Sequence, residues 1–261
     1  QFDSTEHAAN LFALKEFGNI YTRIMNPTND ALEKRLAALE GGLACLTVSS
    51  GQTASTFAIL NVAKAGDNIV SSTDLYGGTV SLFTHTLSKL GIEVRYADPA
   101  DPKNFEKAID DKTRAFYGET LPNPYLRVFP IKEVSDIGRK YNIPLIMDNT
   151  ASPVLCKPLE HGAAIVVYSL TKYIVGHGTF VGVALIDGGN FDWTADPKRQ
   201  PLFNEPDASY GGAVWGKVVP ELTGANVSFA VRSRVVLLRD LGAAVSPDNA
   251  FGLIQGLETC L

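Results

Sequence analysis

The sequence contains little cysteine. Cysteine occurs three times in 261 residues, at Cys45, Cys156 and Cys260, and no two of these residues are close in the chain. A disulfide framework needs several paired cysteines, and a cysteine-rich zinc site needs closely spaced ones. We therefore expect neither a disulfide scaffold nor a metal site, and we expect the protein to work in a reducing compartment, the cytoplasm.

Long apolar runs and an excess of positive charge are also lacking. No apolar stretch approaches the roughly 18 residues that a membrane-spanning helix needs, and we expect no secretory signal. The net charge is −5 and no basic run occurs, so nothing favours a nucleic-acid partner. Because 45% of the residues are apolar, a large core can form, and the length suits one large domain or one and a half ordinary ones.

Both ends of the sequence read as cut. The first residue is Gln1, and the last residues, NAFGLIQGLETCL, place apolar side chains at helical spacing without a glycine, proline or basic ending. We therefore expect the chain to be part of a longer polypeptide.

Apolar strands alternate with amphipathic helices along the chain. Strands are predicted over residues 43–49, 68–72, 92–97, 113–118, 144–148, 163–169 and 180–186. Helices are predicted over residues 29–40, 53–64, 79–90, 104–110, 131–141, 230–241 and 248–261, with a long loop over residues 188–225. Such alternation requires crossover connections. We predict an α/β fold with a mostly parallel, seven-stranded sheet covered by helices on both faces.

Polar or aromatic clusters follow five of the predicted strands. In chain order they are SSGQ (49–52), DLYGG (74–78), ETLPNP (119–124), DNT (148–150) and SLTK (169–172). Ligands of open parallel sheets bind at the carboxyl ends of the strands. We predict that the five clusters form one binding site.

The first cluster is suited to an anion. Gly51 and Gln52 begin a helix directly after a strand, and the N–H groups and dipole of a helix start favour negative charge. Ser169 and Thr171 could add hydroxyl donors. An ordinary strand-to-helix turn with a small N-cap would look the same, so this pattern alone leaves both readings open.

The remaining clusters supply a lysine, an aspartate and a tyrosine. Each has an ordinary explanation: Lys172 as a solvated surface lysine, Asp148 as a turn or cap residue, and Tyr76 as a packing residue. Together the three residues suggest a cofactor site. A desolvated lysine is a good Schiff-base nucleophile, and an aspartate at a strand end can pair with a protonated pyridine nitrogen. With a stacking tyrosine and a phosphate site, these are the parts that pyridoxal 5'-phosphate (PLP) needs.

Seven segments resemble the Cys/Met-metabolism family of PLP-dependent enzymes. They occur in the order of the family and span nearly the whole chain: YTRIMNPT (21–28), SSGQTAS (49–55), DLYGGT (74–79), ETLPNP (119–124), MDNT (147–150), SLTKYIVGHGT (169–179) and LRDLGAAVSPDNAF (238–251). The resemblance implies the large domain of the fold-type I, aminotransferase-like superfamily. It further implies a neighbour-reaching arm over residues 1–28, a PLP-binding domain over 29–228, and the start of a truncated C-terminal domain over 229–261.

The resemblance also assigns roles to the site residues. Lys172 would carry the cofactor as a Schiff base and move protons, Asp148 would pair with the pyridine nitrogen, and Tyr76 would stack on the ring. The other implied cofactor contacts are Gly51, Gln52, Asn123, Thr150, Ser169 and Thr171. In this family the YTR segment reaches the site of the neighbouring subunit, so Tyr21 and Arg23 would complete the partner's phosphate pocket in a homo-oligomer, with a dimer of dimers expected.

Two details point to one branch of the family. GHGT after the lysine, and YGGTVSLF without an arginine after the threonine, resemble O-acetylhomoserine sulfhydrylases. The implied reaction is γ-replacement on O-acetyl-L-homoserine by sulfide or a thiol, giving homocysteine or methionine.

Three alternatives remain at this point. A cystathionine or methionine γ-lyase of the same family is the nearest. A PLP-binding but non-catalytic protein is the second, because the C-terminal domain that grips the substrate carboxylate is missing. A dinucleotide-binding oxidoreductase is disfavoured, because Val181 stands where a GxGxxG motif needs its third glycine.

Overall fold

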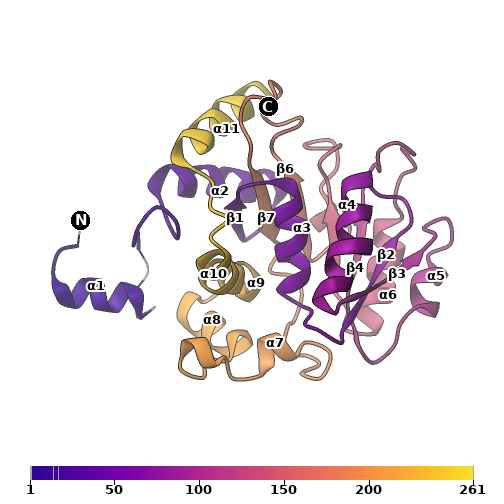
Figure 1. Ribbon diagram of the computed structural model, residues 1–261, viewed down its shortest axis with the longest axis horizontal. Coiled ribbons are helices and arrows are strands. Elements are labelled where there is room, and N and C mark those ends of the chain that lie inside the picture. The colour runs from indigo at the N-terminus through magenta and orange to yellow at the C-terminus, as the bar shows by residue number, and fades with distance from the viewer. Residues whose placement is uncertain (1, 14, 17, 261) are drawn as a thin grey trace.

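A seven-stranded sheet forms the centre of the computed structural model, which describes residues 2–13, 15–16 and 18–260 (Figure 1). The strands lie across the sheet in the order β1 (Ala44–Val48), β7 (Val183–Asp187), β6 (Ile165–Ser169), β5 (Leu145–Asp148), β4 (Thr113–Glu119), β2 (Asn68–Ser72) and β3 (Glu93–Ala97). β7 is antiparallel to both of its neighbours, and the other pairs are parallel. The predicted mostly parallel, seven-stranded sheet is therefore confirmed.

The direction of β7 decides what lies at each edge of the sheet. Because β7 is antiparallel to β1 and to β6, β1 runs in the same direction as β6. The six strands other than β7 thus end at one edge, which we call the carboxyl edge. The polar clusters that follow β1, β2, β4, β5 and β6 all start there.

Both faces of the sheet are buried over most of its width, and the edge strand β3 is the partly exposed exception. Alternate strand residues enter two separate cores, because successive side chains of a strand point to opposite faces. α3 (Gly51–Leu60) and α4 (Gly77–Ser81) cover the first face, with Leu46, Tyr117, Ile146 and Val167 beneath them. α2 (Pro27–Glu40), α6 (Ile131–Lys140) and α11 (Pro247–Cys260) cover the second face, with Cys45, Phe116, Met147 and Val166 beneath them.

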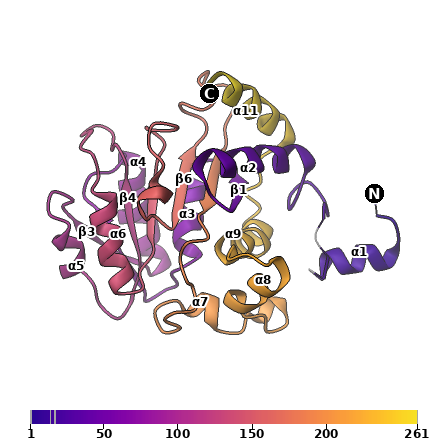
Figure 2. The same cartoon turned by 180° about the vertical axis from the view of Figure 1, so that it is seen from behind.

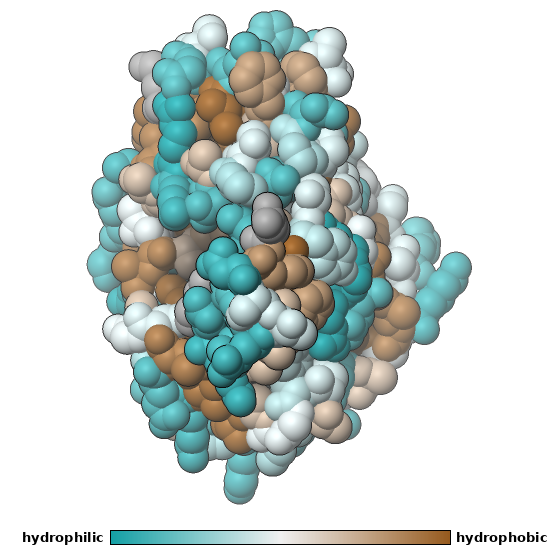
Figure 3. All heavy atoms as spheres, turned by 90° about the vertical axis from the view of Figure 1, so that its left-hand side faces the viewer, coloured by the Kyte–Doolittle hydropathy of each residue, from teal (hydrophilic) through white to brown (hydrophobic). Residues whose placement is uncertain are grey.

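The remaining helical segments have at most nine residues each. They are α1 (Thr5–Phe12), η1 (Leu82–Leu87), η2 (Ser88–Leu90), α5 (Lys103–Lys107), η3 (Pro158–His161), α7 (Pro201–Asn204), η4 (Ala208–Tyr210), α8 (Trp215–Thr223), α9 (Ser228–Arg232), η5 (Ser233–Leu238) and α10 (Arg239–Leu241). α1 projects away from the sheet in both ribbon views (Figures 1 and 2). The face that carries α1 mixes hydrophilic and hydrophobic residues (Figure 3). Within the described ranges, the helices are all too short or too polar to cross a membrane.

The prediction of a long loop over residues 188–225 is wrong. This segment contains α7, η4 and α8, and it buries Trp193, Phe203 and Trp215. The rings of Trp193 and Phe203 stack with their centroids 4.3 Å apart. Pro201 made α7 hard to recognise in the sequence, because proline usually interrupts a helix. In α7 it occupies the first turn, where a missing N–H costs nothing.

Candidate functional site

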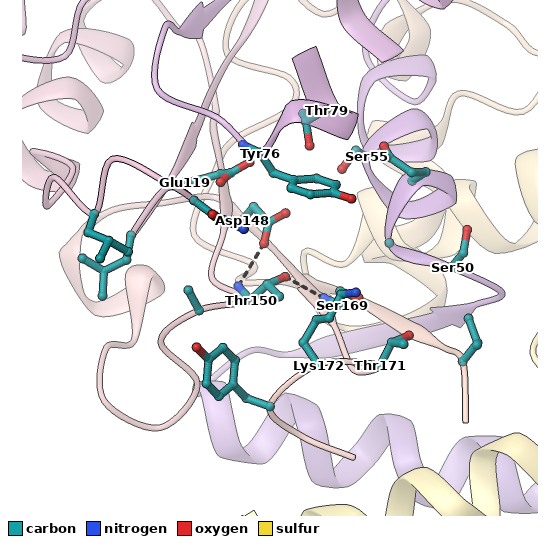
Figure 4. A pocket seen from close by; sticks show the side chains of 18 residues that line it. Ser50, Ser55, Tyr76, Thr79, Glu119, Asp148, Thr150, Ser169, Thr171 and Lys172 are labelled. Carbon is teal, nitrogen blue, oxygen red and sulfur yellow. Dashed lines mark hydrogen bonds between the residues drawn. The ribbon is translucent and has the colours of Figure 1, made fainter. Parts of the chain in front are cut away.

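A pocket of about 640 Å³ opens at the carboxyl edge, where the sequence predicts a site (Figure 4). Nine of the predicted residues line it: Gly51, Gln52, Tyr76, Asn123, Asp148, Thr150, Ser169, Thr171 and Lys172. Residues to which the sequence assigned no role also line it: Ser50, Ser55, Thr79, Glu119, Leu121, Leu126, Ala151, Tyr173 and Val181. Ser55 could have been found by helical spacing, because it follows Gly51 by one turn of α3.

The start of α3 forms one end of the pocket, where its N–H groups suit an anion. Ser50 is the N-cap, and its hydroxyl accepts a hydrogen bond from the Thr53 N–H at 3.3 Å. The N–H groups of the first helical turn have no partner inside the helix. A side chain at Gly51 would place its Cβ 3.2 Å from the Cβ of Ser169, which is a tight contact, so glycine favours the close approach of the helix start to that strand end. Gln52 adds a buried Oε1 atom without a hydrogen-bond partner.

The turn after β6 presents Lys172. Thr171 fixes this turn to the start of β7, because its hydroxyl accepts a hydrogen bond from the Gly182 N–H at 3.2 Å. Leu170 and Ile174 are buried on either side and anchor the turn to the core. Lys172 itself is exposed, which corrects the expectation that the protein alone removes it from water. The turn lies at the rim of the pocket, where the side chain reaches solvent.

Thr150 connects the aspartate of β5 to the lysine-bearing strand. Its backbone N–H donates to Asp148 Oδ1 at 2.9 Å, and its hydroxyl accepts from the Ser169 N–H at 2.8 Å (Figure 4). Burial raises the pKa of Asp148 above its ordinary value, and the hydrogen bonds from Thr150 oppose the rise. A cation at this carboxylate would relieve the cost of burying its charge.

Glu119 places a second carboxyl group next to Asp148. The two residues are paired in register on the parallel strands β4 and β5. Glu119 Oε1 accepts a hydrogen bond from the Tyr76 N–H at 2.8 Å. Burial, and then the negative charge of Asp148, raise the pKa of Glu119 to about 8.

The charges of the pocket are unbalanced. Among the lining residues that the structure describes, Glu119 and Asp148 are acidic, and Lys172 alone is basic. Asp148 suits a cationic nitrogen, the start of α3 suits an anion, and Lys172 is the available amine. The pocket therefore fits a ligand that carries a basic nitrogen at one end and a phosphate at the other.

Two predicted residues, Tyr21 and Arg23, do not reach this pocket. The Arg23 guanidinium donates to the carbonyl oxygen of Arg239 in α10 and lies 5.2 Å from the centroid of the Tyr21 ring. Both residues are therefore absent from the site of their own chain, and a role in a neighbouring chain stays a prediction.

Comparison with known proteins identifies relatives across the whole length. The family described as Cys/Met metabolism PLP-dependent enzymes matches residues 1–261. The chain is 54% identical to an O-acetyl-L-homoserine sulfhydrylase of Leptospira meyeri over 263 residues, and 47% identical to one of Corynebacterium glutamicum. Each alignment covers 99% of this chain and 59% of the relative, so the chain spans about three fifths of these proteins.

Solved structures agree with the family match. A Campylobacter jejuni structure assigned as an O-acetylhomoserine (thiol)-lyase, with N'-pyridoxyl-lysine-5'-monophosphate, has a TM-score of 0.93 and 41% identity. This match covers 100% of the present chain and 64% of that structure. An O-acetylhomoserine sulfhydrylase of Wolinella succinogenes has a TM-score of 0.75 and 36% identity, covering 90% of this chain and 63% of that one. The chain belongs to the Cys/Met-metabolism family of PLP-dependent enzymes.

Proposed function

We propose that this protein binds PLP in the pocket and transfers the carbon chain of O-acetyl-L-homoserine to sulfide or a thiol, forming homocysteine or methionine. One observation carries the proposal: Lys172, Asp148 and the start of α3, which lie far apart in the sequence, line a single pocket. The similarity to O-acetylhomoserine sulfhydrylases supports the choice of substrate.

The residues present fit the cofactor. The N–H groups at the start of α3, the close approach that Gly51 permits, and the hydroxyls of Ser169 and Thr171 provide a polar end suited to the phosphate. Asp148 would face the pyridine nitrogen, Tyr76 would pack on the ring, and Asn123 would contact the ring hydroxyl. When bound, PLP supplies an electron sink for the negative charge that develops at the substrate Cα.

The protein's own groups then handle protons and charge. Lys172 Nζ would hold the cofactor and, once released, would take the proton from the substrate Cα, pass it on, and then take a proton from Cβ as acetate leaves from Cγ. Asp148, when ionised, would keep the pyridine nitrogen protonated. The sulfur nucleophile would give up its proton as it forms the new bond at Cγ, and Cβ and Cα would each regain a proton through Lys172.

We also propose that the working protein is a homo-oligomer in which Tyr21 and Arg23 complete the pocket of a neighbouring chain. Lys172 is the one basic residue among the described lining residues, whereas the phosphate and the substrate carboxylate both bring negative charge. A second cation is therefore needed, and Arg23 lies on the N-terminal arm of residues 1–28. The family resemblance favours a dimer of dimers. The three free cysteines support a reducing location, the cytoplasm.

A product assay tests the reaction. Purified protein with PLP, O-acetyl-L-homoserine and methanethiol should release acetate and methionine in equal amounts. A 2-oxo acid and ammonia in place of methionine would show a γ-lyase. Visible absorption by bound PLP without any product would show a binding protein that does not catalyse.

Mixed oligomers test the shared site. Arg23→Ala and Lys172→Ala chains should each be nearly inactive alone. Mixing them should restore part of the activity, because some pockets would then receive Lys172 from one chain and Arg23 from the other. If mixing restores nothing, the sites are not shared in this way.

A further inference from the structure

We propose that Glu119 is a positioning residue: its carboxylate holds in place the two loops that carry Tyr76 and Asn123 at the pocket. The inference rests on the proposed function for the identity of what these loops contact, namely PLP. Glu119 itself is buried in the pocket wall beside Tyr76 and is not proposed to react (Figure 4).

One carboxyl group joins segments from two different strands. Glu119 ends β4, Asn123 follows in the loop after β4, and Tyr76 lies in the loop after β2. The Tyr76 N–H donates to Glu119 Oε1 at 2.8 Å. The Asn123 N–H lies near the same carboxyl group, where it lowers the pKa of Glu119. Both loops are thereby fixed to the end of a rigid central strand.

Glu119 is one of three anchors of the Tyr76 loop. Tyr76 precedes α4 as its N-cap residue, and no side chain caps that helix. Leu75 is buried in the core beside it. Farther out, Arg127 Nε donates to Oδ2 of the buried Asp74 at 2.7 Å and connects the same two loops. Of these anchors, Glu119 is the one that lines the pocket.

Burying the carboxyl group of Glu119 costs free energy that a purely structural side chain would not need to cost. It lies next to Asp148, and burial together with that neighbour disfavours its charged form. Elsewhere in this protein the buried Asp67 is paired with the guanidinium of Arg114 at 2.7 Å. Within the described ranges Glu119 forms no such ion pair, so its partners are the two loop N–H groups and not a cation.

The substitution Glu119→Gln tests whether Glu119 acts by accepting hydrogen bonds from the loops or only by filling space. Glu119→Gln keeps the size of the side chain but replaces one oxygen by an NH₂ group, which cannot accept a hydrogen bond. The two loop N–H groups are then left with a single acceptor oxygen. Asp187→Asn is the matched control, because Asp187 is buried at the opposite edge and accepts from Gly189 and Ala230 N–H groups at 3.0 and 3.1 Å.

The first measurement needs no cofactor. Amide hydrogen exchange at Tyr76 or Asn123 should become at least about tenfold faster in Glu119→Gln, as expected when a protecting hydrogen bond is lost. In Asp187→Asn, faster exchange should be confined to Gly189 and Ala230. Unchanged exchange at both Tyr76 and Asn123 in Glu119→Gln would overturn the inference. If that variant does not fold, Glu119→Asp, which withdraws both oxygens by one methylene, gives the same test.

The second measurement uses the PLP-loaded protein. Circular dichroism of the cofactor band reports how the ring is held, and it should weaken per bound PLP in Glu119→Gln, with kcat at least about tenfold lower and KM little changed. An unchanged cofactor band with faster loop exchange would also overturn the positioning role. If wild-type protein takes up no PLP while exchange responds as expected, the proposed function fails and the loop connection stands.

Discussion

At the amino-terminal edge of the sheet, the buried carboxylate of Asp67 meets the buried guanidinium of Arg114, whereas at the carboxyl edge Asp148 and Glu119 lie side by side. In the described part of the chain, neither of these two acids forms a salt bridge. Burial, and then the negative charge of Asp148, raise the pKa of Glu119 to about 8. The Asp67–Arg114 pair at the first edge neutralises its own charges within the fold. The carboxyl edge keeps an excess of negative charge that a cationic ligand would neutralise. Stable cores pair their buried charges, and binding sites commonly depart from this rule.

The largest expected effect is at Lys172, the basic residue that lines the pocket. Lys172→Ala should lower turnover by about a thousandfold or more, because the amine that holds the cofactor and transfers protons is removed. Borohydride reduction of the PLP-loaded wild-type protein should label the peptide containing Lys172, and the variant should show no label.

Lys132→Ala is the control for Lys172. Lys132 is exposed on α6 and pairs only with Asp136 of the same helix, so turnover and labelling should stay at wild-type levels. A labelled peptide from a lysine other than Lys172 would show that the wrong residue has been assigned.

A substitution at the opposite edge should lower the stability of the protein and leave its PLP spectrum unchanged. Arg114→Met leaves Asp67 as a buried charge without its partner, which typically costs about 3–5 kcal/mol of unfolding free energy. Urea unfolding measures this loss, and the absorption spectrum of PLP in the folded fraction should stay unchanged. A loss of bound PLP without a loss of stability would contradict the division between the two edges.

Much of the site is predictable because parallel strands bring their carboxyl ends together. Nine of the eleven residues expected at the site line one pocket, although they come from five separate segments. Each segment is a short polar cluster after an apolar run, and the repeated crossover pattern is enough to gather them. Tyr21 and Arg23 are the exceptions, and one chain cannot test a contact between two chains.

Other features leave no local signal in the sequence. β7 looks like any buried apolar strand, so its antiparallel direction cannot be read from its residues. The segment of residues 188–225 looks like a loop, because the pairing of Trp193 with Phe203 depends on tertiary packing. Glu119 ends an ordinary strand, and its importance appears only when the loop of Tyr76 is seen to fold onto it.

Within the pocket, Asp148→Asn should have a smaller effect than loss of the lysine. The amide is similar in size, so PLP should remain bound, but it cannot stabilise a protonated pyridine nitrogen. Loss of such electrostatic support costs about a hundredfold in turnover. Steady-state kinetics with the cofactor content measured in parallel tests this, and near-normal turnover would mean that another group serves the ring nitrogen.

The smallest effect concerns pH and distinguishes the two edges by their titration ranges. Burial raises the pKa of Asp187 from 3.8 to about 6, and burial with Asp148 raises the pKa of Glu119 from 4.5 to about 8. An acid with a raised folded-state pKa binds its proton more tightly when folded, so stability is greatest at low pH and falls as pH rises through the folded pKa.

The two variants should therefore flatten different parts of the stability curve. For cofactor-free protein, Asp187→Asn should remove a fall of about 1–3 kcal/mol in unfolding free energy between about pH 4 and 6, at roughly 1.4 kcal/mol per pKa unit. Glu119→Gln should remove a fall that continues from pH 6 to 8. Glu40, whose pKa burial raises to about 7, titrates in an overlapping range, so each variant must be compared with wild type at the same pH. If Glu119→Gln and wild type lose stability in parallel between pH 6 and 8, Glu119 is already ionised in the folded protein. Keeping two buried carboxylates side by side at the carboxyl edge would then cost less free energy than their geometry indicates.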